Sequence, residues 1–152
     1  MITVAAVWIP LVAELTPANA ADNEVAPRLL PELPPPLRFL LGDTSYDDSA
    51  RHEQWAAAGR ILITSKRGPY PHTDPGVEVR RVVHQLRSHA IENFNGQFKG
   101  IFDTHGQVPT RGLLATRRYV LGAVLVYQVT LLYRHGLGAD LRVGLKPFLT
   151  AA

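Results

Sequence analysis

The chain has 152 residues, of which 46% are apolar, which is enough for one domain with a core of its own. It contains no Cys, which excludes a disulfide framework and a thiolate metal site and points to a reducing, cytoplasmic compartment. The net charge is +3, and Arg outnumbers Lys. Because Arg suits contact with phosphates, the composition permits a nucleic-acid partner without identifying one.

The first segment of the chain is apolar and interrupted by Pro. We expect a buried strand over residues 4–7, a turn at Ile9-Pro10 and a second apolar run over residues 11–15. The triplet at 18–20 also gives this segment the form of a secretory signal. A signal is disfavoured because no basic residue lies near the start and Glu14 interrupts the apolar stretch.

A short helix is expected next, over residues 19–30. Pro27 fits a helix only within the first turn, and Pro31 should end this one at or before Leu30. The three prolines at 34–36 then form a stiff connector without regular structure.

Two short apolar runs, at residues 37–41 and 61–64, are typical of strands covered on both faces. Between them a helix is expected over residues 46–58, with Asp47, Asp48 or Ser49 as its cap and Gly59 at its end. A loop rich in Gly and Pro follows at 66–76.

The second half of the chain is mainly helical in pattern. Residues 77–102 predict one long helix or two, and residues 111–135 predict a last long helix after a turn at 106–109. The stretch 119–133 has no charged residue, but it is shorter than the roughly 20 residues of a membrane span, so we expect a buried helix. Residues 136–152 have the Gly and Pro spacing of a loop. The order of strands and helices predicts an α/β fold.

Two acidic residues are candidates for a site, and each also has a purely structural explanation. Asp43 follows a predicted strand at the position where open α/β sheets place ligand-binding groups, although it would equally serve as a helix cap. Glu92 shares one face of the predicted 77–102 helix with other polar residues, a face that solvation alone explains. That polar face consists of Gln85, Ser88, Glu92, Asn95 and Lys99, with Ile91, Phe94 and Phe98 beside it.

Taken together, the two segments resemble the second and third parts of the catalytic triad of DDE-type bacterial insertion-sequence transposases. The first is Gly42-Asp43-Thr44-Ser45-Tyr46-Asp47, in which Ser45 replaces the family's usual Gly. The second is Ile91-Glu92-Asn93-Phe94, with Lys99 seven residues beyond the Glu. The likeness extends from about Ile9 to His135.

This resemblance implies a ribonuclease H-like α/β fold, a mixed sheet with flanking helices, incomplete at the amino terminus. The partial catalytic domain would span residues 1–135, and residues 136–152 would be a carboxyl-terminal tail. Asp43 and Glu92 would hold divalent metal, usually two Mg²⁺ ions, for DNA cleavage and strand transfer. Lys99, Arg87, Lys66 and Arg67 would contact the DNA, which comprises the transposon ends and the target. The resemblance implies a protein of the bacterial cytoplasm that has no membrane partner. A homo-oligomer is possible.

Three features depart from the family pattern. The Tyr and Arg expected before the Glu are replaced by Gln85 and Ser88, and Arg87 is displaced by one residue. No residue matches the family's first Asp, since Asp22 corresponds to a loop position. We therefore expect this truncated chain to be inactive alone.

Two other interpretations remain open at the level of the sequence. One is a noncatalytic interaction or DNA-binding module derived from a transposase, in which the long apolar helix from Tyr119 packs against a partner chain. The other is a small membrane-associated or secreted protein, based on the two apolar segments.

Overall fold

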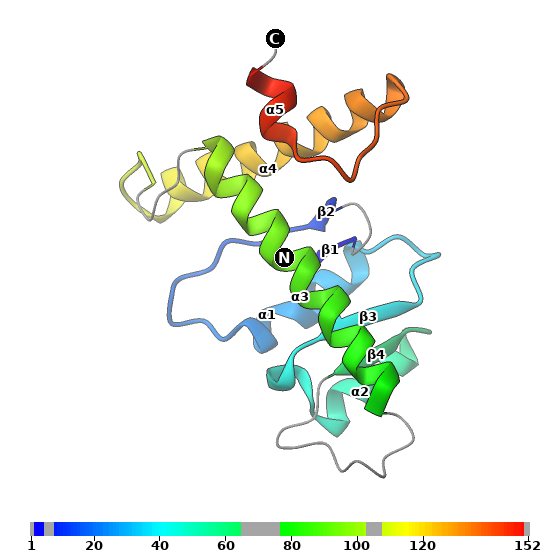
Figure 1. Ribbon diagram of the computed structural model, residues 1–152. Helices are drawn as coiled ribbons and strands as arrows, with labels where there is room; N and C mark the ends of the chain where they lie inside the picture. Colours follow the sequence, from blue (N-terminus) through cyan, green and yellow to red (C-terminus); the bar gives the residue numbers. More distant parts are fainter. Residues whose placement is uncertain (1, 5–7, 65–76, 103–107, 151–152) are drawn as a thin grey trace. The chain divides into compact units, whose positions relative to one another are not determined.

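The computed structural model describes residues 2–4, 8–64, 77–102 and 108–150 (Figure 1). The chain forms two compact units: unit 1 contains Met1–Leu29 and Ala90–Ala152, and unit 2 contains Leu30–His89. The long helix α3 (Val77–Phe102) contributes residues to both units. The structure is of mixed α/β class, as predicted, and the described strands form two separate pairs.

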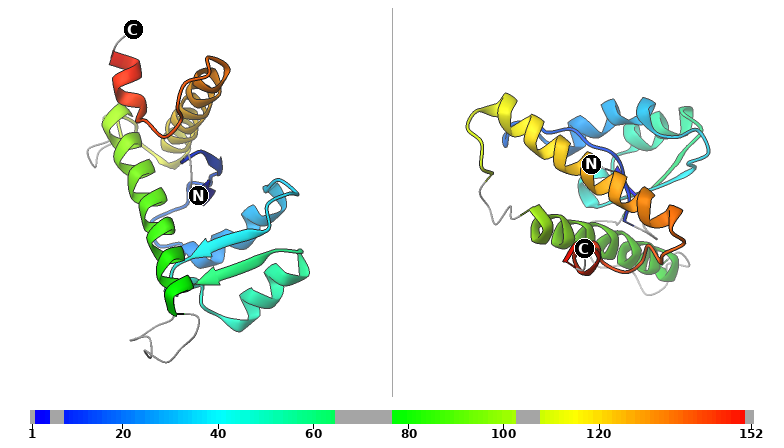
Figure 2. Two further views of the ribbon diagram at one scale, coloured as in Figure 1. Left: turned by 45° about the vertical axis from the view of Figure 1, so that its right-hand side comes forward. Right: turned by 90° about the horizontal axis from the view of Figure 1, so that it is seen from above.

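Unit 2 is built on a parallel pair of strands, β3 (Phe39–Gly42) and β4 (Ile61–Thr64), joined through helix α2 (Ser49–Ala57). Figure 2 shows the two arrows side by side, pointing the same way. These elements confirm the predicted strand–helix–strand order. Their shared core consists of Leu40, Trp55 and Leu62, all nearly inaccessible to solvent.

The termini of α2 follow the predicted chemistry. Asp48 is the amino-terminal cap, because its Oδ1 accepts a hydrogen bond of 3.0 Å from the backbone N–H of Ala50. Gly59 lies just past the helix with φ of +70°, a conformation that glycine adopts without strain.

One expectation for this unit was too strong. Phe39 and Ile61, the first residues of the two strands, are 61% and 55% exposed, so the strands are not covered on both faces along their whole length. Two paired strands offer less surface for covering helices than the wider parallel sheet that their apolar sequence suggested.

The amino-terminal segment of unit 1 differs from the expected strand and turn. An antiparallel pair forms between β1 (Ile2–Thr3) and β2 (Pro10–Val12), and the part of the expected strand at 5–7 lies outside the described residues. Pro10 begins a strand and does not form a turn, which is possible because the first residue of a strand can lack an N–H donor. The chain turns before it, where Trp8 has φ of +54°.

Helix α1 (Asp22–Leu29) is followed by the 3₁₀ turn η1 (Leu30–Glu32), so the helix ends before Pro31 as expected. Pro27 lies in the second turn of α1, and the expectation that it fits only the first turn was wrong. In so short a helix Pro27 removes one hydrogen bond. Burial of Val25, Ala26 and Leu29 offsets this loss.

Three helices form the rest of unit 1: the carboxyl-terminal part of α3, α4 (Leu113–Gly136) and α5 (Leu145–Thr150). The first two confirm the predicted long helices, and residues 77–102 form one helix. Helix α5 lies where a loop was expected. The whole loop predicted at 66–76 lies outside the described residues, as do residues 106–107 of the turn predicted at 106–109.

The core of unit 1 gathers residues from these three helices. It consists of Phe94, Tyr127, Leu131 and Leu145, each at most 2% exposed. The rings of Phe94 and Tyr127 meet edge to face, with centroids 5.1 Å apart. Gln97 adds a polar link, because its Oε1 accepts a 3.0 Å hydrogen bond from the backbone N–H of Leu145.

None of the helices within the described part of the chain combines the length and apolar content needed to cross a membrane.

Candidate functional site

The carboxyl ends of β3 and β4 meet at one edge of unit 2. Gly42 pairs with Thr64 at the last position of the two strands, and Asp43 follows directly. In Figure 2 both arrowheads point toward the amino-terminal part of α3, which belongs to the same unit. The edge thus brings Asp43 close to a residue of α3, Arg87.

Asp43 caps the short 3₁₀ turn η2 (Thr44–Tyr46), as its structural explanation predicted. Its Oδ1 accepts hydrogen bonds from both the backbone N–H, at 2.9 Å, and the hydroxyl of Ser45. Desolvation by itself would raise the pKa of the Asp43 carboxyl. The two Ser45 hydrogen bonds and the positive charge of Arg87 outweigh it, so this pKa lies below its usual range. Asp43 therefore keeps its negative charge to a lower pH than an ordinary carboxyl does.

A second polar group at the same edge joins α2 to β4. The Thr64 hydroxyl donates a 2.9 Å hydrogen bond to Asp47 Oδ1, and His52 Nε2 lies 3.5 Å from the same oxygen. Thr64 is nearly buried, whereas Asp47 and His52 are each about one-third exposed. The group holds the segment after β3 against the end of β4.

Gly42 makes this close approach possible. A Cβ atom at Gly42 would lie 3.0 Å from Cβ of Tyr46 and 3.2 Å from Cγ2 of Thr64. Both distances are tighter than ordinary van der Waals contact. Only a residue without a side chain therefore fits between β4 and η2 without displacement.

Glu92 and Lys99 lie on the part of α3 that belongs to unit 1. Both are exposed, on the polar face that the sequence predicted, while Phe94 on the apolar face is 2% exposed. This part of α3 thus exposes a polar face to solvent.

The predicted site residues are distributed over both units. Asp43 and Arg87 lie in unit 2, and Glu92 and Lys99 lie in unit 1. Lys66 and Arg67 lie outside the described residues. In the described part of the chain, no group of three or more His, Asp or Glu side chains is placed to hold a metal ion.

Sequence reasoning missed the roles of His52 and Thr64. Thr64 was recognised only as the last residue of a strand, and His52 only as part of a helix. A usable signal existed, because two parallel strands bring their carboxyl ends together and therefore place Thr64 beside the residues that follow Gly42.

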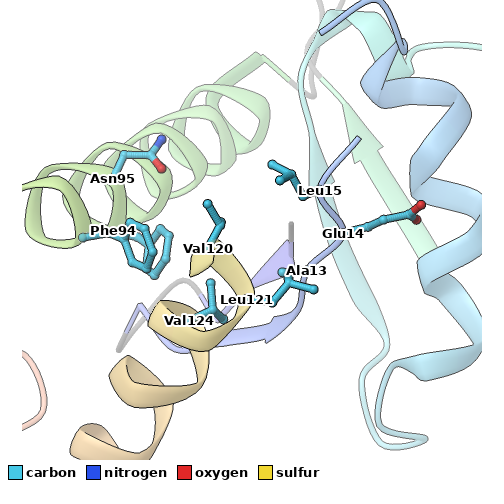
Figure 3. Close-up of a pocket in the computed structure, with 9 residues that line it drawn as sticks. Ala13, Glu14, Leu15, Phe94, Asn95, Val120, Leu121 and Val124 are labelled. Atoms are coloured by element: carbon cyan, nitrogen blue, oxygen red, sulfur yellow. The ribbon is translucent and has the colours of Figure 1, made fainter. Parts of the chain in front are cut away.

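A separate hollow in unit 1 is mainly apolar (Figure 3). It measures about 180 Å³, with Phe94, Val120 and Val124 in its wall. Glu14 borders it, but Figure 3 shows its carboxylate turned toward α1, where Oε1 lies 3.7 Å from a nitrogen of Arg28. The hollow offers space without a converging set of reactive groups.

The chemistry available at the β3–β4 edge is that of hard oxygen ligands beside positive charge. An ionised carboxylate, a second acidic residue and a guanidinium suit a divalent cation or a phosphate, and they provide no activated nucleophile. Comparisons of this chain with protein-family models, with curated proteins and with solved structures found no match.

Proposed function

We propose that this chain is part of a DDE-type insertion-sequence transposase catalytic domain, in which Asp43 and Glu92 are two of the metal-binding carboxylates. The observation that carries the proposal is the position of Asp43 at the carboxyl end of a parallel strand pair. It directly follows a strand in a parallel pair, and its pKa is held low. Carboxylates at the carboxyl ends of strands are the usual ligand-binding groups of α/β proteins.

The arrangement of elements also supports the proposal. The order β3, α2, β4 and then a long helix carrying Glu92 fits the strand–helix order that the resemblance implies. A ribonuclease H-like sheet would need further strands beside β3 and β4. The proposal therefore includes that this chain forms only part of such a sheet.

The oxygen ligands of the chain suit Mg²⁺. Both Ser45 hydrogen bonds end on Oδ1 of Asp43, and neither uses Oδ2. Asp43 and Glu92 would hold two metal ions, which stabilise the attacking and leaving oxygens in phosphoryl transfer. The sequence contains no match to the family's first Asp, so the site would need another carboxylate. We therefore expect no DNA cleavage by this chain alone.

Basic residues would provide the contacts with DNA, namely the transposon ends and the target in the bacterial cytoplasm. Lys99 is exposed on the same face of α3 as Glu92, which suits phosphate contact beside a metal ligand. Arg87 lies close enough to Asp43 to lower its pKa, and its guanidinium would contact phosphate beside that carboxylate.

The test is Mn²⁺ binding to the whole chain, measured by electron paramagnetic resonance. We expect binding that Asp43→Asn and Glu92→Gln each weaken by about 10-fold or more, since each removes an anionic ligand. Glu53→Gln, at an exposed acid of α2, is the matched control and should leave binding unchanged. Equal affinity in the wild type and both site variants would contradict the proposed site.

A parallel incubation with supercoiled plasmid and Mg²⁺ or Mn²⁺ tests the activity of the chain. The expected result is intact plasmid. Nicking that disappears in Asp43→Asn and Glu92→Gln would overturn the expected inactivity and support the same site.

A further inference from the structure

Helix α4 is apolar on two opposite sides. One side faces the core of unit 1 through Ala123, Val124, Tyr127 and Leu131. At 3.6 residues per turn, Leu125, Val129 and Leu132 fall on the opposite side. These three are 58%, 55% and 68% exposed. A helix that is apolar all round is normally buried all round, so the outer side requires an explanation.

The exposed apolar surface is large. Besides Leu125, Val129 and Leu132, four further apolar side chains that fall toward the same side of α4 or at its end are at least half exposed: Leu114, Val126, Tyr133 and Leu137. At on the order of 100 Å² for each such side chain, the seven expose roughly 700 Å². This exceeds the about 300–600 Å² of the largest patch on a typical monomer and approaches the about 800 Å² of one side of a stable interface.

A groove runs beside this surface. It lies between β2 and α4, measures about 290 Å³ and is lined by Ile9, Pro10 and Leu11 opposite Leu125, Val129 and Leu132. Gln128 also lines the groove, but its side-chain N–H donates a 2.7 Å hydrogen bond to the carbonyl oxygen of Pro10. The groove is therefore suited to apolar side chains.

We propose that the outer face of α4, together with this groove, binds the same surface of a second copy of the chain. The part of this face between Tyr119 and Tyr133 contains no charged residue, so two copies of that part can pack without charge repulsion; the exposed Arg118 lies at its amino-terminal edge. The spacing of Leu125, Val129 and Leu132, four residues and then three, is that of a helix-pairing seam. A two-fold interface needs a self-complementary surface, and an uncharged apolar ridge beside an apolar groove satisfies this need.

The absence of Cys from the sequence gives a direct test. In a two-fold pair, a residue near the axis meets its own copy. A Val129→Cys variant of the whole chain should therefore form a disulfide-linked dimer under mild oxidation. The matched control is Val143→Cys, because Val143 is 52% exposed in the same unit but lies outside α4. The control should cross-link at least about 10-fold more slowly, at the rate of random encounter.

Sedimentation equilibrium of the unmodified chain and of Val129→Glu completes the test. The unmodified chain should dimerise, and Val129→Glu should raise the dimer Kd by at least about 100-fold, because the charge is buried twice in a two-fold interface. Val143→Glu should dimerise like the unmodified chain, and circular dichroism should show the same helix content in all three. The proposal would be overturned if the unmodified chain stayed monomeric up to about 100 μM. Equal rates of cross-linking of Val129→Cys and Val143→Cys would overturn it as well.

Discussion

Three neighbouring acids after β3 each bind a different group. Asp43 caps η2, Asp47 accepts a hydrogen bond from Thr64, and Asp48 caps α2. Asp43 in addition lies near the positive charge of Arg87, which together with the Ser45 hydrogen bonds lowers its pKa. Local sequence does not distinguish the three, because each has the same carboxylate within the same short segment. The contacts of each carboxylate make the distinction.

Gly42→Ala should destabilise the chain by about 1–3 kcal/mol, because the added methyl group would press against Tyr46 and Thr64. Gly96→Ala is the matched control, since a Cβ atom at that helical position meets nothing within 4 Å. It should stabilise the chain by about 0.5–1 kcal/mol by favouring the helix. Urea unfolding followed by circular dichroism measures both. Equal effects of the two substitutions would contradict the packing at Gly42.

The pKa of Asp43 should rise when either of its partners is removed. Ser45→Ala should raise it more than Arg87→Gln, because the Ser45 hydroxyl has the larger effect. Carboxyl chemical shifts in a ¹³C NMR titration measure the pKa directly. Glu53→Gln should leave it unchanged, and an ordinary pKa for Asp43 in the unmodified chain would refute the assignment.

The same shift predicts how Asp43 affects stability. A carboxyl whose pKa is lower in the folded chain stabilises the fold above its unfolded pKa of about 3.9 and ceases to do so as the pH falls through the folded pKa. The stability difference between the unmodified chain and Asp43→Asn should be constant from about pH 7 to 5 and shrink below about pH 4. A difference that grows on acidification would contradict the sign of the shift.

At the scale of elements, a buried arginine helps to hold the carboxyl-terminal segment against α4. Arg134, on the inner side of α4, is 4% exposed. Its guanidinium donates hydrogen bonds to the carbonyl oxygens of Asp140 and Val143, and its charge lies over the ring of Phe148. These contacts connect α4 to α5 through backbone carbonyl groups and an aromatic ring.

Arg134→Met should destabilise this segment by about 1–3 kcal/mol, because the carbonyl oxygens of Asp140 and Val143 lose the donor that the buried guanidinium provides. Amide hydrogens of residues 141–149 should exchange faster, which hydrogen-exchange mass spectrometry detects. Arg118→Met, an exposed position on the same helix, is the control and should leave their exchange unchanged. Unaltered protection in Arg134→Met would show that the guanidinium does not hold the segment.

At the scale of the whole molecule, the chain forms two compact units, although its length predicted one domain. Unit 1 is discontinuous in sequence, since its residues precede and follow those of unit 2. Each unit has buried apolar residues of its own. The predicted division into a domain of 1–135 and a tail of 136–152 remains a prediction, although Leu145 of that tail is part of the core of unit 1.

The two Trp residues allow the units to be followed separately, because Trp8 lies in unit 1 and Trp55 in unit 2. In a Trp55→Phe background, Leu131→Ala should lower the unfolding midpoint reported by Trp8, since it removes about 2–5 kcal/mol of packing from unit 1. In a Trp8→Phe background, Leu62→Ala should do the same for Trp55 in unit 2. Each core substitution should affect the fluorescence of its own unit more strongly. Equal effects on both probes would indicate a single cooperative unit.

The sequence by itself determined the elements whose signals are local. Apolar runs bounded by Gly predicted β4 to the residue and the ends of β3 and α2 to within three residues, and helical periodicity predicted α3 and α4. The position of Asp43 after a strand followed from the same local pattern. These features depend on residues close together in the chain, so a single sequence contains them.

Only the tertiary structure decided the features that depend on distant partners. Helix α5 was missed because its stability comes from burial of Leu145 against Phe94 and Tyr127 and from the hydrogen bond to Gln97, none of which is near it in sequence. The contact of Thr64 with Asp47 likewise depends on the parallel register of β3 and β4. Packing and strand pairing between residues far apart in the sequence stabilise these features. Local helix and strand propensities therefore do not predict them.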